Sequence, residues 1–162
     1  AYLSALRAAS REVLIANAYF VPDRRIRRAL AAAARRGVSV SILVQGRSDI
    51  RSVWYASRSR YDFLLRHGVR LFEWPGPILH AKAAAIDETW SAVGSYNLSH
   101  RSLLHNLEVN LHVLDAGFSA QLAGLIRQDM EQSREIHLEQ WRRRPLKDKL
   151  VERFFYLFRY FF

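Results

Sequence analysis

The sequence predicts an α/β fold in which helices pack on a sheet. Short apolar runs alternate with longer segments of helical periodicity through the first half of the chain, which is typical of this class. The chain has 162 residues and half of them are hydrophobic, which suits one domain with a sizeable core. It contains no internal repeat and no low-complexity tract, so a solenoid or a disordered chain is excluded.

Hydrophobic periodicity and turn residues place the individual elements. Apolar runs predict strands at 13–20, 38–44, 69–74, 79–86, 90–94 and 107–114. Apolar residues at three- and four-residue spacing predict helices over 1–11, about 24–36, about 51–67 and about 116–134, and Pro145 opens a last one. Asp23 and Gly37 are the expected N-cap and C-cap of the second helix, and Pro75-Gly76-Pro77 predicts a turn.

The charge and the cysteine count narrow the classes of function. A formal net charge of +10 favours an anionic partner such as nucleic acid, anionic lipid or a phosphorylated substrate. Many of the arginines cluster, at 24–28, 35–36 and 142–144. Each cluster alone is typical of a solvated helix face. The absence of cysteine excludes disulfides and thiolate catalysis. No signal peptide and no apolar run long enough to span a membrane is visible.

The stretch 79–103 carries the chemistry. It contains H-x-K-x4-D, with His80, Lys82 and Asp87, and then G-S-x-N from Gly94. His80 and Lys82 lie two residues apart in a predicted strand, so both side chains should project from one face of the sheet. An imidazole beside an ammonium group predicts an anion between them.

These residues suit chemistry at phosphorus. A neutral His80 imidazole is a competent nucleophile, while Lys82 and Asn97 can bind non-bridging oxygens whose charge grows in the transition state. Ser95 and Asn97 can donate to the same phosphate from a second wall. Glu108, on the polar face of the next predicted strand, is the best candidate to hold the His80 tautomer. Neither a metal nor a cofactor is required, and no other histidine has zinc-ligand spacing.

H-x-K-x4-D followed by G-S-x-N resembles the HKD motif of the phospholipase D superfamily. The resemblance implies a mixed sheet sandwiched between helices and phosphodiesterase or phosphatidyltransferase activity. It also matches Glu108, eleven positions after Asn97, to the superfamily's histidine-orienting glutamate. The implied catalytic set is His80, Lys82, Asp87, Asn97 and Glu108, with phosphate bound by His80, Lys82, Ser95 and Asn97. We interpret Asp87 as structural, because it falls at a strand end where a carboxylate can fix a turn or a neighbouring cation.

Longer segments resemble the bacterial cardiolipin synthases, over nearly the whole chain. They are NAYFVPD at 17–23, PGPILH at 75–80, NLEVN at 106–110 and EQWRRRP at 139–145. The resemblance implies phosphatidyl transfer between phosphatidylglycerol molecules through a phosphohistidine, forming cardiolipin and glycerol. Tyr96 and Ser99-His100 depart from the family pattern, which puts the headgroup preference in doubt.

The resemblance also implies that the chain holds only half of a site. Members of this superfamily pair two HKD motifs, in which one histidine attacks phosphorus while the other protonates the leaving alcohol; this chain has one. The resemblance implies that 1–145 is the C-terminal catalytic half-domain, and a start within a predicted helix suggests a fragment of a longer chain. The second motif should come from an N-terminal half or from a second copy, and which histidine attacks is left open. A peripheral place on the cytoplasmic side of the bacterial inner membrane is implied.

The segment 146–162 is predicted to be a basic, aromatic amphipathic tail. Its apolar residues recur at helical spacing, at Leu146, Leu150, Phe154, Leu157, Phe158 and Phe161. Such a helix is typical of an interfacial membrane binder, and the alternative is packing on the domain or on the missing half.

Two other functions compete with phosphatidyl transfer. Water could be the acceptor, which would make a phosphodiesterase that hydrolyses phospholipid or nucleic acid. The net charge suits DNA, but nothing interleaves like a groove-reading element, so nucleic acid is not expected. A non-catalytic membrane or assembly module is disfavoured by the intact set of motif residues.

Overall fold

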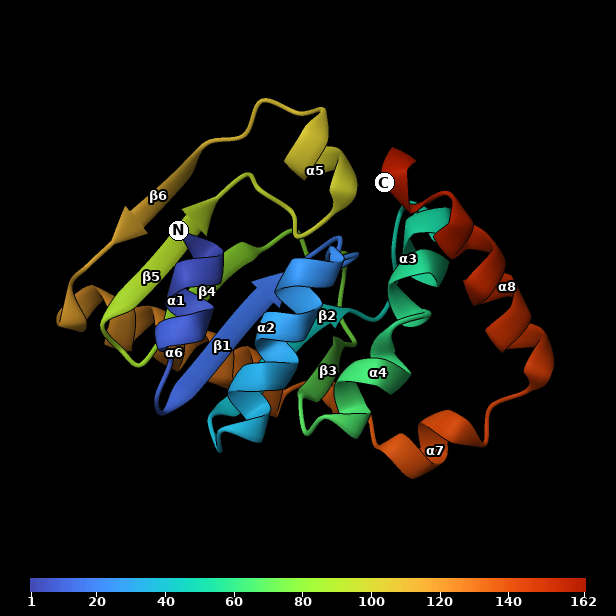
Figure 1. Cartoon of the computed structure of the whole chain (residues 1–162), viewed down its shortest axis with the longest axis horizontal. Coiled ribbons are helices and arrows are strands. Elements are labelled where there is room, and N and C mark those ends of the chain that lie inside the picture. Colours follow the sequence, from blue (N-terminus) through green and yellow to red (C-terminus); the bar gives the residue numbers. More distant parts are fainter.

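The computed structural model describes residues 1–162, and seven strands form one sheet in the order β6-β5-β4-β1-β2-β3-β7 (Figure 1). The sheet is mixed, because β1, β2 and β3 run parallel while all other neighbours are antiparallel. The strands are β1 Glu12–Asn17, β2 Ser39–Gln45, β3 Arg70–Trp74, β4 Lys82–Ile86, β5 Trp90–Gly94, β6 Asn110–Val113 and β7 Arg134–Glu135.

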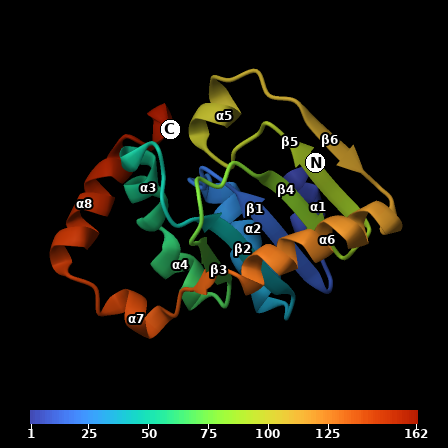
Figure 2. The same cartoon turned by 180° about the vertical axis from the view of Figure 1, so that it is seen from behind.

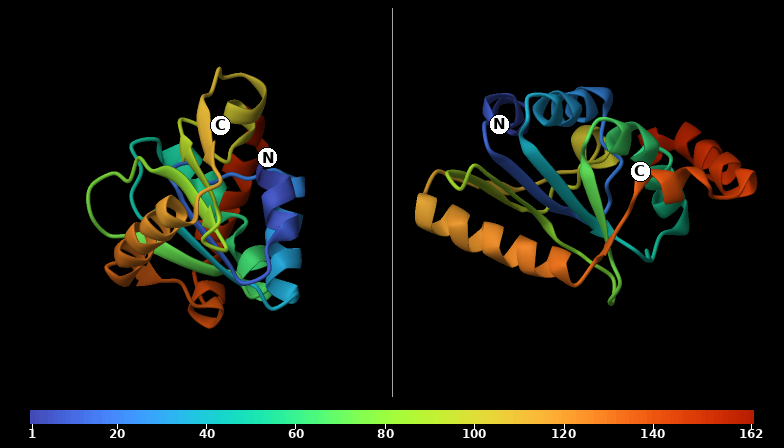
Figure 3. Two further views of the ribbon diagram at one scale, coloured as in Figure 1. Left: turned by 90° about the vertical axis from the view of Figure 1, so that its left-hand side faces the viewer. Right: turned by 90° about the horizontal axis from the view of Figure 1, so that it is seen from below.

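Helices cover both faces of the sheet, as the sequence predicts. α1 and α2 lie on one face and the long α6 lies on the other (Figures 2 and 3), while α3, α7 and α8 gather beyond β3. The helices are α1 Tyr2–Ala8, α2 Arg24–Arg35, α3 Arg51–Arg58, α4 Tyr61–Arg66, α5 His100–Leu104, α6 Ala116–Glu131, α7 Leu138–Arg142 and α8 Leu146–Leu157, and a 3-10 turn, η1, spans Arg159–Phe161.

Alternate residues of β1 supply two separate cores, as the two-residue repeat of a strand requires. Val13 and Ile15 belong to a core of 22 buried residues that includes side chains of α1, α2 and α4. Leu14 and Ala16 belong to a core of 9 buried residues shared with α6. A third cluster joins α3 to α8 around Tyr156. Strands that are buried on both faces explain the nearly continuous apolar runs in the sequence.

Local signals place α2 correctly. The Asp23 carboxylate accepts a hydrogen bond from Ile26 N at 2.8 Å, which satisfies an amide that the first turn leaves without a partner. Gly37 has a φ of +89°, the left-handed conformation that ends a helix at little cost only for glycine. Both predicted caps are confirmed.

The single helix predicted over 51–67 is wrong, because the chain forms two helices. The Ser59 hydroxyl donates to the Ala56 carbonyl at 2.8 Å and occupies an acceptor at the end of α3. α3 packs against α8, whereas α4 packs against α7 and β3. The break between α3 and α4 allows the two helices to pack against different elements.

The strand predicted over 107–114 is shorter in the structure, where β6 covers only Asn110–Val113. β6 is an edge strand, and its one partner is β5. Leu107 and Val109 are therefore almost fully exposed, at 103% and 80%. The alternating apolar residues of 107–114 therefore form an apolar surface that this chain leaves uncovered.

Candidate active site

His80 lies just outside the sheet, because the strand predicted at 79–86 begins at Lys82. β4 pairs with β1 only as far as Asn17, opposite Lys82, and one more amide of that segment donates to the Ala81 carbonyl at 2.9 Å. Beyond this point no strand lies beside the chain. His80 is consequently exposed while Lys82 is buried, so the expectation that both project from one strand face is wrong.

Lys82 interacts with the backbone of His80 and with the charge of Glu108. Its Nζ donates to the His80 carbonyl at 2.9 Å, which fixes the bend between the two residues. Burial lowers the pKa of Lys82, and the negative charge of Glu108 opposes that shift. The ammonium group of a lysine has three donors, so Lys82 can bind a phosphate oxygen as well as the His80 carbonyl.

Asp87, at the other end of β4, is held by the chain that enters β1. Its carboxylate accepts from the amides of Ser10, Arg11 and Glu12, each at 2.8 Å, and from the Ser10 hydroxyl at 2.9 Å. Burial alone would raise its pKa, but these hydrogen bonds outweigh burial and lower it. Asp87 and Glu88 both have a φ of 53°, as a two-residue hairpin turn requires. These are the contacts of a turn-fixing residue.

The Gly94-Ser95 segment approaches the chain before β6 closely. A Cβ at position 94 would collide with the Val109 carbonyl, so this position accepts only glycine. Ser95 N donates to that carbonyl at 2.9 Å, and Val109 N donates to Ser95 Oγ at 3.0 Å. The Ser95 hydroxyl in turn donates to Glu108, which also accepts from Asn106 Nδ2 at 3.1 Å.

Glu108 is therefore fixed as an anion, although not by His80. Burial would raise the pKa of Glu108, but hydrogen bonds from Ser95 and Asn106 and the charge of Lys82 lower it. The His80 imidazole makes no hydrogen bond, to Glu108 or to any other side chain. The orienting role of Glu108 stays a prediction.

Asn97 is brought to this place by contacts that the sequence did not reveal. Its Oδ1 accepts from Tyr19 N at 3.3 Å, which ties the turn to the end of β1. The next amide, of Leu98, donates to Asn17 Oδ1 at 3.1 Å, and Asn17 Nδ2 is buried without a partner. Asn17 lies opposite Lys82 in the sheet register, so a free amide donor is buried beside the motif lysine. An asparagine inside an apolar strand was the available signal.

A hollow of about 400 Å³ opens next to Asn97. Its lining includes Tyr19, Arg101 and Asn106, and the C-terminal Phe161 and Phe162 close one side. Arg101 adds an exposed cation that motif reasoning missed. A lining that combines polar donors with aromatic rings suits a ligand with a phosphate and an apolar part. The structure contains no cluster of histidine and carboxylate side chains suited to a metal ion.

The fold and this motif define a phospholipase D-like domain. NUC from Salmonella typhimurium, a phospholipase D family member, has a TM-score of 0.74 at 22% identity over 84% of this chain and 88% of that one. A phosphatidylserine synthase from Haemophilus influenzae has a TM-score of 0.77 at 14% identity over 99% of this chain and 44% of that one. At such identities the likeness establishes the fold.

The family follows from sequence. Residues 2–132 match the family described as cardiolipin synthase, PLD-like domain, and the chain belongs to this family. Cardiolipin synthase A of Klebsiella pneumoniae is 39% identical over 98% of the chain, and that of Yersinia pseudotuberculosis is equally similar. The chain spans about a third of the length of these relatives, 32% in both cases.

Proposed function

We propose that this chain supplies one half of the active site of a phosphatidyltransferase of the cardiolipin synthase type. The observation that carries the proposal concerns the start of β4, next to His80. Lys82, Ser95, Asn97 and Glu108 gather there. Lys82 and Asn97 are the phosphate-binding donors, and Ser95 joins them if its hydroxyl exchanges Glu108 for the phosphate. Membership of the cardiolipin synthase family supports phosphatidylglycerol as the substrate.

In the first step an imidazole nitrogen attacks the phosphorus of phosphatidylglycerol. A P–N bond forms, the bond from phosphorus to the glycerol headgroup oxygen breaks, and a second histidine protonates the departing alkoxide. Lys82 and Asn97 stabilise the charge that develops on the non-bridging oxygens. Glu108, once it reaches His80, would hold the tautomer that makes one nitrogen available.

In the second step a headgroup hydroxyl of another phosphatidylglycerol attacks the phosphohistidine. The second histidine accepts the proton of that hydroxyl, a P–O bond forms and the P–N bond breaks. The products are cardiolipin and glycerol, and both histidines return to their starting states. Each histidine can perform either role, so His80 is the nucleophile or the general acid.

The second histidine must come from outside this chain. The apolar surface along β6, which includes Leu107, Val109, Leu111 and Leu114 at 64–103% exposure, supports a covering partner, since an exposed apolar strand edge favours association. The chain covers 32% of its relatives, which agrees with an N-terminal half in the same polypeptide. A second copy of the chain is the other possible source.

We further propose that the α8 side lies on the membrane surface. The apolar residues at 146–162 that recur at helical spacing are all exposed, from 43% at Phe158 to 75% at Leu146. The structure contains no helix with the length and apolarity of a membrane span. An exposed apolar stripe flanked by lysines and arginines supports peripheral binding to an anionic leaflet, and the cytoplasmic side of the bacterial inner membrane fits this charge.

Incubation with phosphatidylglycerol, followed by thin-layer chromatography, tests the activity. Full-length or dimeric protein, which supplies both HKD motifs, should form cardiolipin and glycerol, and His80→Ala should lower the rate at least about a thousandfold. His137→Ala is the matched control, because His137 is exposed and makes no side-chain hydrogen bond. Phosphatidic acid in place of cardiolipin would assign hydrolysis instead, and full activity of His80→Ala would refute the proposed site.

A further inference from the structure

A second cationic hollow, separate from the HKD residues, lies where the start of α2 meets α4, α5 and α8. Its volume is about 370 Å³, and no carboxylate lines it. Six of its lining residues carry or can carry positive charge: Arg24, Arg27, Arg60, Arg153, Arg159 and His100. We call this the α2–α8 hollow.

Four of the five arginines of the α2–α8 hollow lack hydrogen-bond and ion-pair partners, while Arg159 donates to the Tyr156 carbonyl and the Tyr160 hydroxyl. Arg24, Arg27, Arg60 and Arg153 make no side-chain hydrogen bond and no ion pair, although Arg60 lies over the Tyr156 ring at 3.7 Å. Buried polar atoms normally have a partner. Only five buried side-chain nitrogen or oxygen atoms of the chain have none, and three belong to this hollow: Arg27 Nε, Arg60 Nε and His100 Nδ1.

The charges also oppose one another. Burial lowers the pKa of Arg27, and the nearby Arg60 and Arg159 lower it further, while Tyr156 and Asp23 oppose the shift. Burial likewise lowers the pKa of His100, with Arg159 adding to the effect. His100 is only 7% exposed. Like charges held close together are stabilised by a bound anion.

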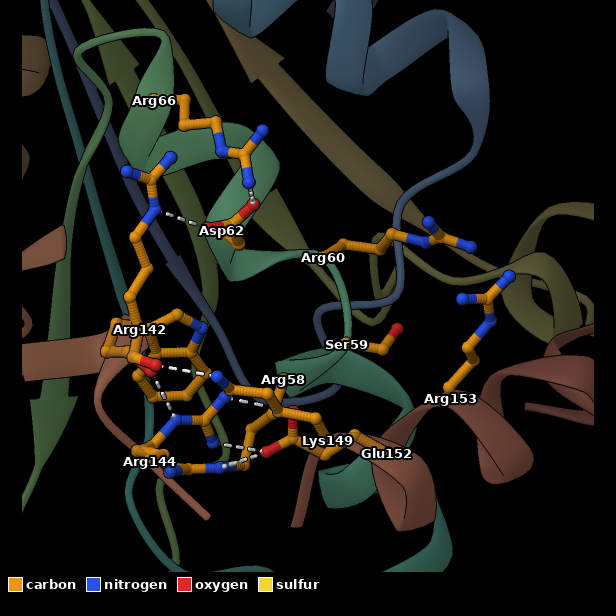
Figure 4. Close-up of a pocket in the computed structure, with 11 residues that line it drawn as sticks. Arg58, Ser59, Arg60, Asp62, Arg66, Arg142, Arg144, Lys149, Glu152 and Arg153 are labelled. Atoms are coloured by element: carbon orange, nitrogen blue, oxygen red, sulfur yellow. Dashed lines mark hydrogen bonds and ion pairs between the residues drawn. The ribbon is translucent and has the colours of Figure 1, made fainter. Parts of the chain in front are cut away.

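A neighbouring hollow provides a comparison within the molecule. It has a volume of about 470 Å³ and shares Arg60 and Arg153 with the first. Its other arginines are paired: Asp62 binds Arg66 and Arg142, and Glu152 binds Arg58 and Arg144. In Figure 4, Arg60 and Arg153 extend away from both carboxylates, and no hydrogen bond or ion pair reaches them. The protein neutralises one set of arginines and leaves the other unpaired.

Apolar surface adjoins the unpaired charges. Leu157 lines the α2–α8 hollow and is 65% exposed. Phe154, Phe158 and Phe161, all exposed, continue the apolar surface along α8 and η1. A free phosphate would use only the arginines, whereas a phospholipid would use both surfaces.

We propose that the α2–α8 hollow binds the phosphate of an anionic phospholipid, whose acyl chains lie along Leu157 and the phenylalanines of α8. This site is additional to the phosphate site at His80 and needs no turnover. His80→Ala protein should therefore keep the lipid-binding event at the α2–α8 hollow, whatever it loses at the first site. Loss of catalysis and loss of this site are thereby distinguishable.

Binding of short-chain phosphatidylglycerol to His80→Ala protein, measured by isothermal titration calorimetry, tests the proposal. In that background Arg27→Gln/Arg60→Gln should weaken binding about tenfold or more. Arg66→Gln removes a positive charge from the neighbouring hollow, where Arg66 is paired with Asp62. It should change the affinity for the lipid less than about twofold. Arg24→Gln/Arg153→Gln changes two exposed, unpaired residues, and it should weaken binding in the same direction if the first pair fails to fold.

Three outcomes would overturn the proposal. One is an equal loss in Arg66→Gln, which would mean that only the overall charge matters. Another is undiminished binding in both double variants. The third is glycerol 3-phosphate binding as tightly as the lipid, which would make the ligand a free phosphate compound. Vesicles of phosphatidylglycerol and phosphatidylcholine should give the same order of variants in sedimentation.

Discussion

The two ends of β4 differ in how far this chain satisfies them. At the far end, the Asp87 carboxylate accepts four hydrogen bonds from Ser10, Arg11 and Glu12. At the near end, the His80 imidazole is exposed and makes none. Both residues belong to one motif of eight positions, yet one is built into the fold and the other is not.

This difference separates a structural role from a chemical one. A carboxylate surrounded by backbone donors of its own chain has little capacity left for a substrate. The exposed His80 imidazole makes no hydrogen bond, so its removal should cost the fold little, and its proposed function depends on a second histidine from outside the chain. The contrast predicts that the two residues divide stability and activity between them.

The largest expected effect on stability is therefore at Asp87. Asp87→Ala removes the acceptor of three amides and a hydroxyl, and we expect the free energy of unfolding to fall by about 2–4 kcal/mol. His80→Ala should change it by less than about 0.5 kcal/mol, since an exposed side chain without partners is removed. Urea denaturation followed by circular dichroism measures both, and equal losses would erase the contrast.

Acid should remove the contribution of Asp87 selectively. Its pKa in the folded protein is lower than the value of about 3.9 expected in the unfolded chain. The unfolded state therefore binds more protons between the two pKa values, so stability falls as the pH decreases through this window. The contribution should be complete above about pH 5 and lost progressively below about pH 4.

Comparison with Asp87→Asn isolates this effect from other carboxylates. Glu108 and Glu135 also have lowered pKa values, so the unmodified protein loses stability in acid for several reasons. The difference in unfolding free energy between the protein and Asp87→Asn should be largest near neutral pH and should shrink toward pH 3. A constant difference over that range would contradict the assigned role.

The sequence predicts what depends on neighbours along the chain. Asp23 and Gly37 mark α2 because caps act within one turn, and the H-x-K and G-S-x-N spacings locate the residues with chemistry. It does not predict the break at Ser59, since that break follows from which helices pack on α3 and α4.

The start of β4 and the role of Asn17 lie beyond local pattern for the same reason. β4 begins at Lys82 because β1 leaves the sheet beside it. This boundary depends on tertiary structure. In the sequence, Asn17 is a single polar residue within an apolar run. Only the sheet register places it opposite Lys82. The short β7 depends entirely on β3 for its pairing.

A smaller effect on stability is expected at Ser95, which follows β5 and binds Glu108 close to the near end of β4. Ser95→Ala removes a hydrogen bond to Glu108 and the acceptor of the Val109 amide, in an exposed segment where water can replace both. The free energy of unfolding should fall by about 0.5–1.5 kcal/mol, less than for Asp87→Ala. Glu108 should also titrate closer to its ordinary pKa, because one of the hydrogen bonds that lower it is gone; nuclear magnetic resonance of the side-chain carboxyl measures this. A loss as large as that of Asp87→Ala would mean that the near end is also built into the fold by this chain alone, and the division between stability and chemistry along β4 would no longer hold.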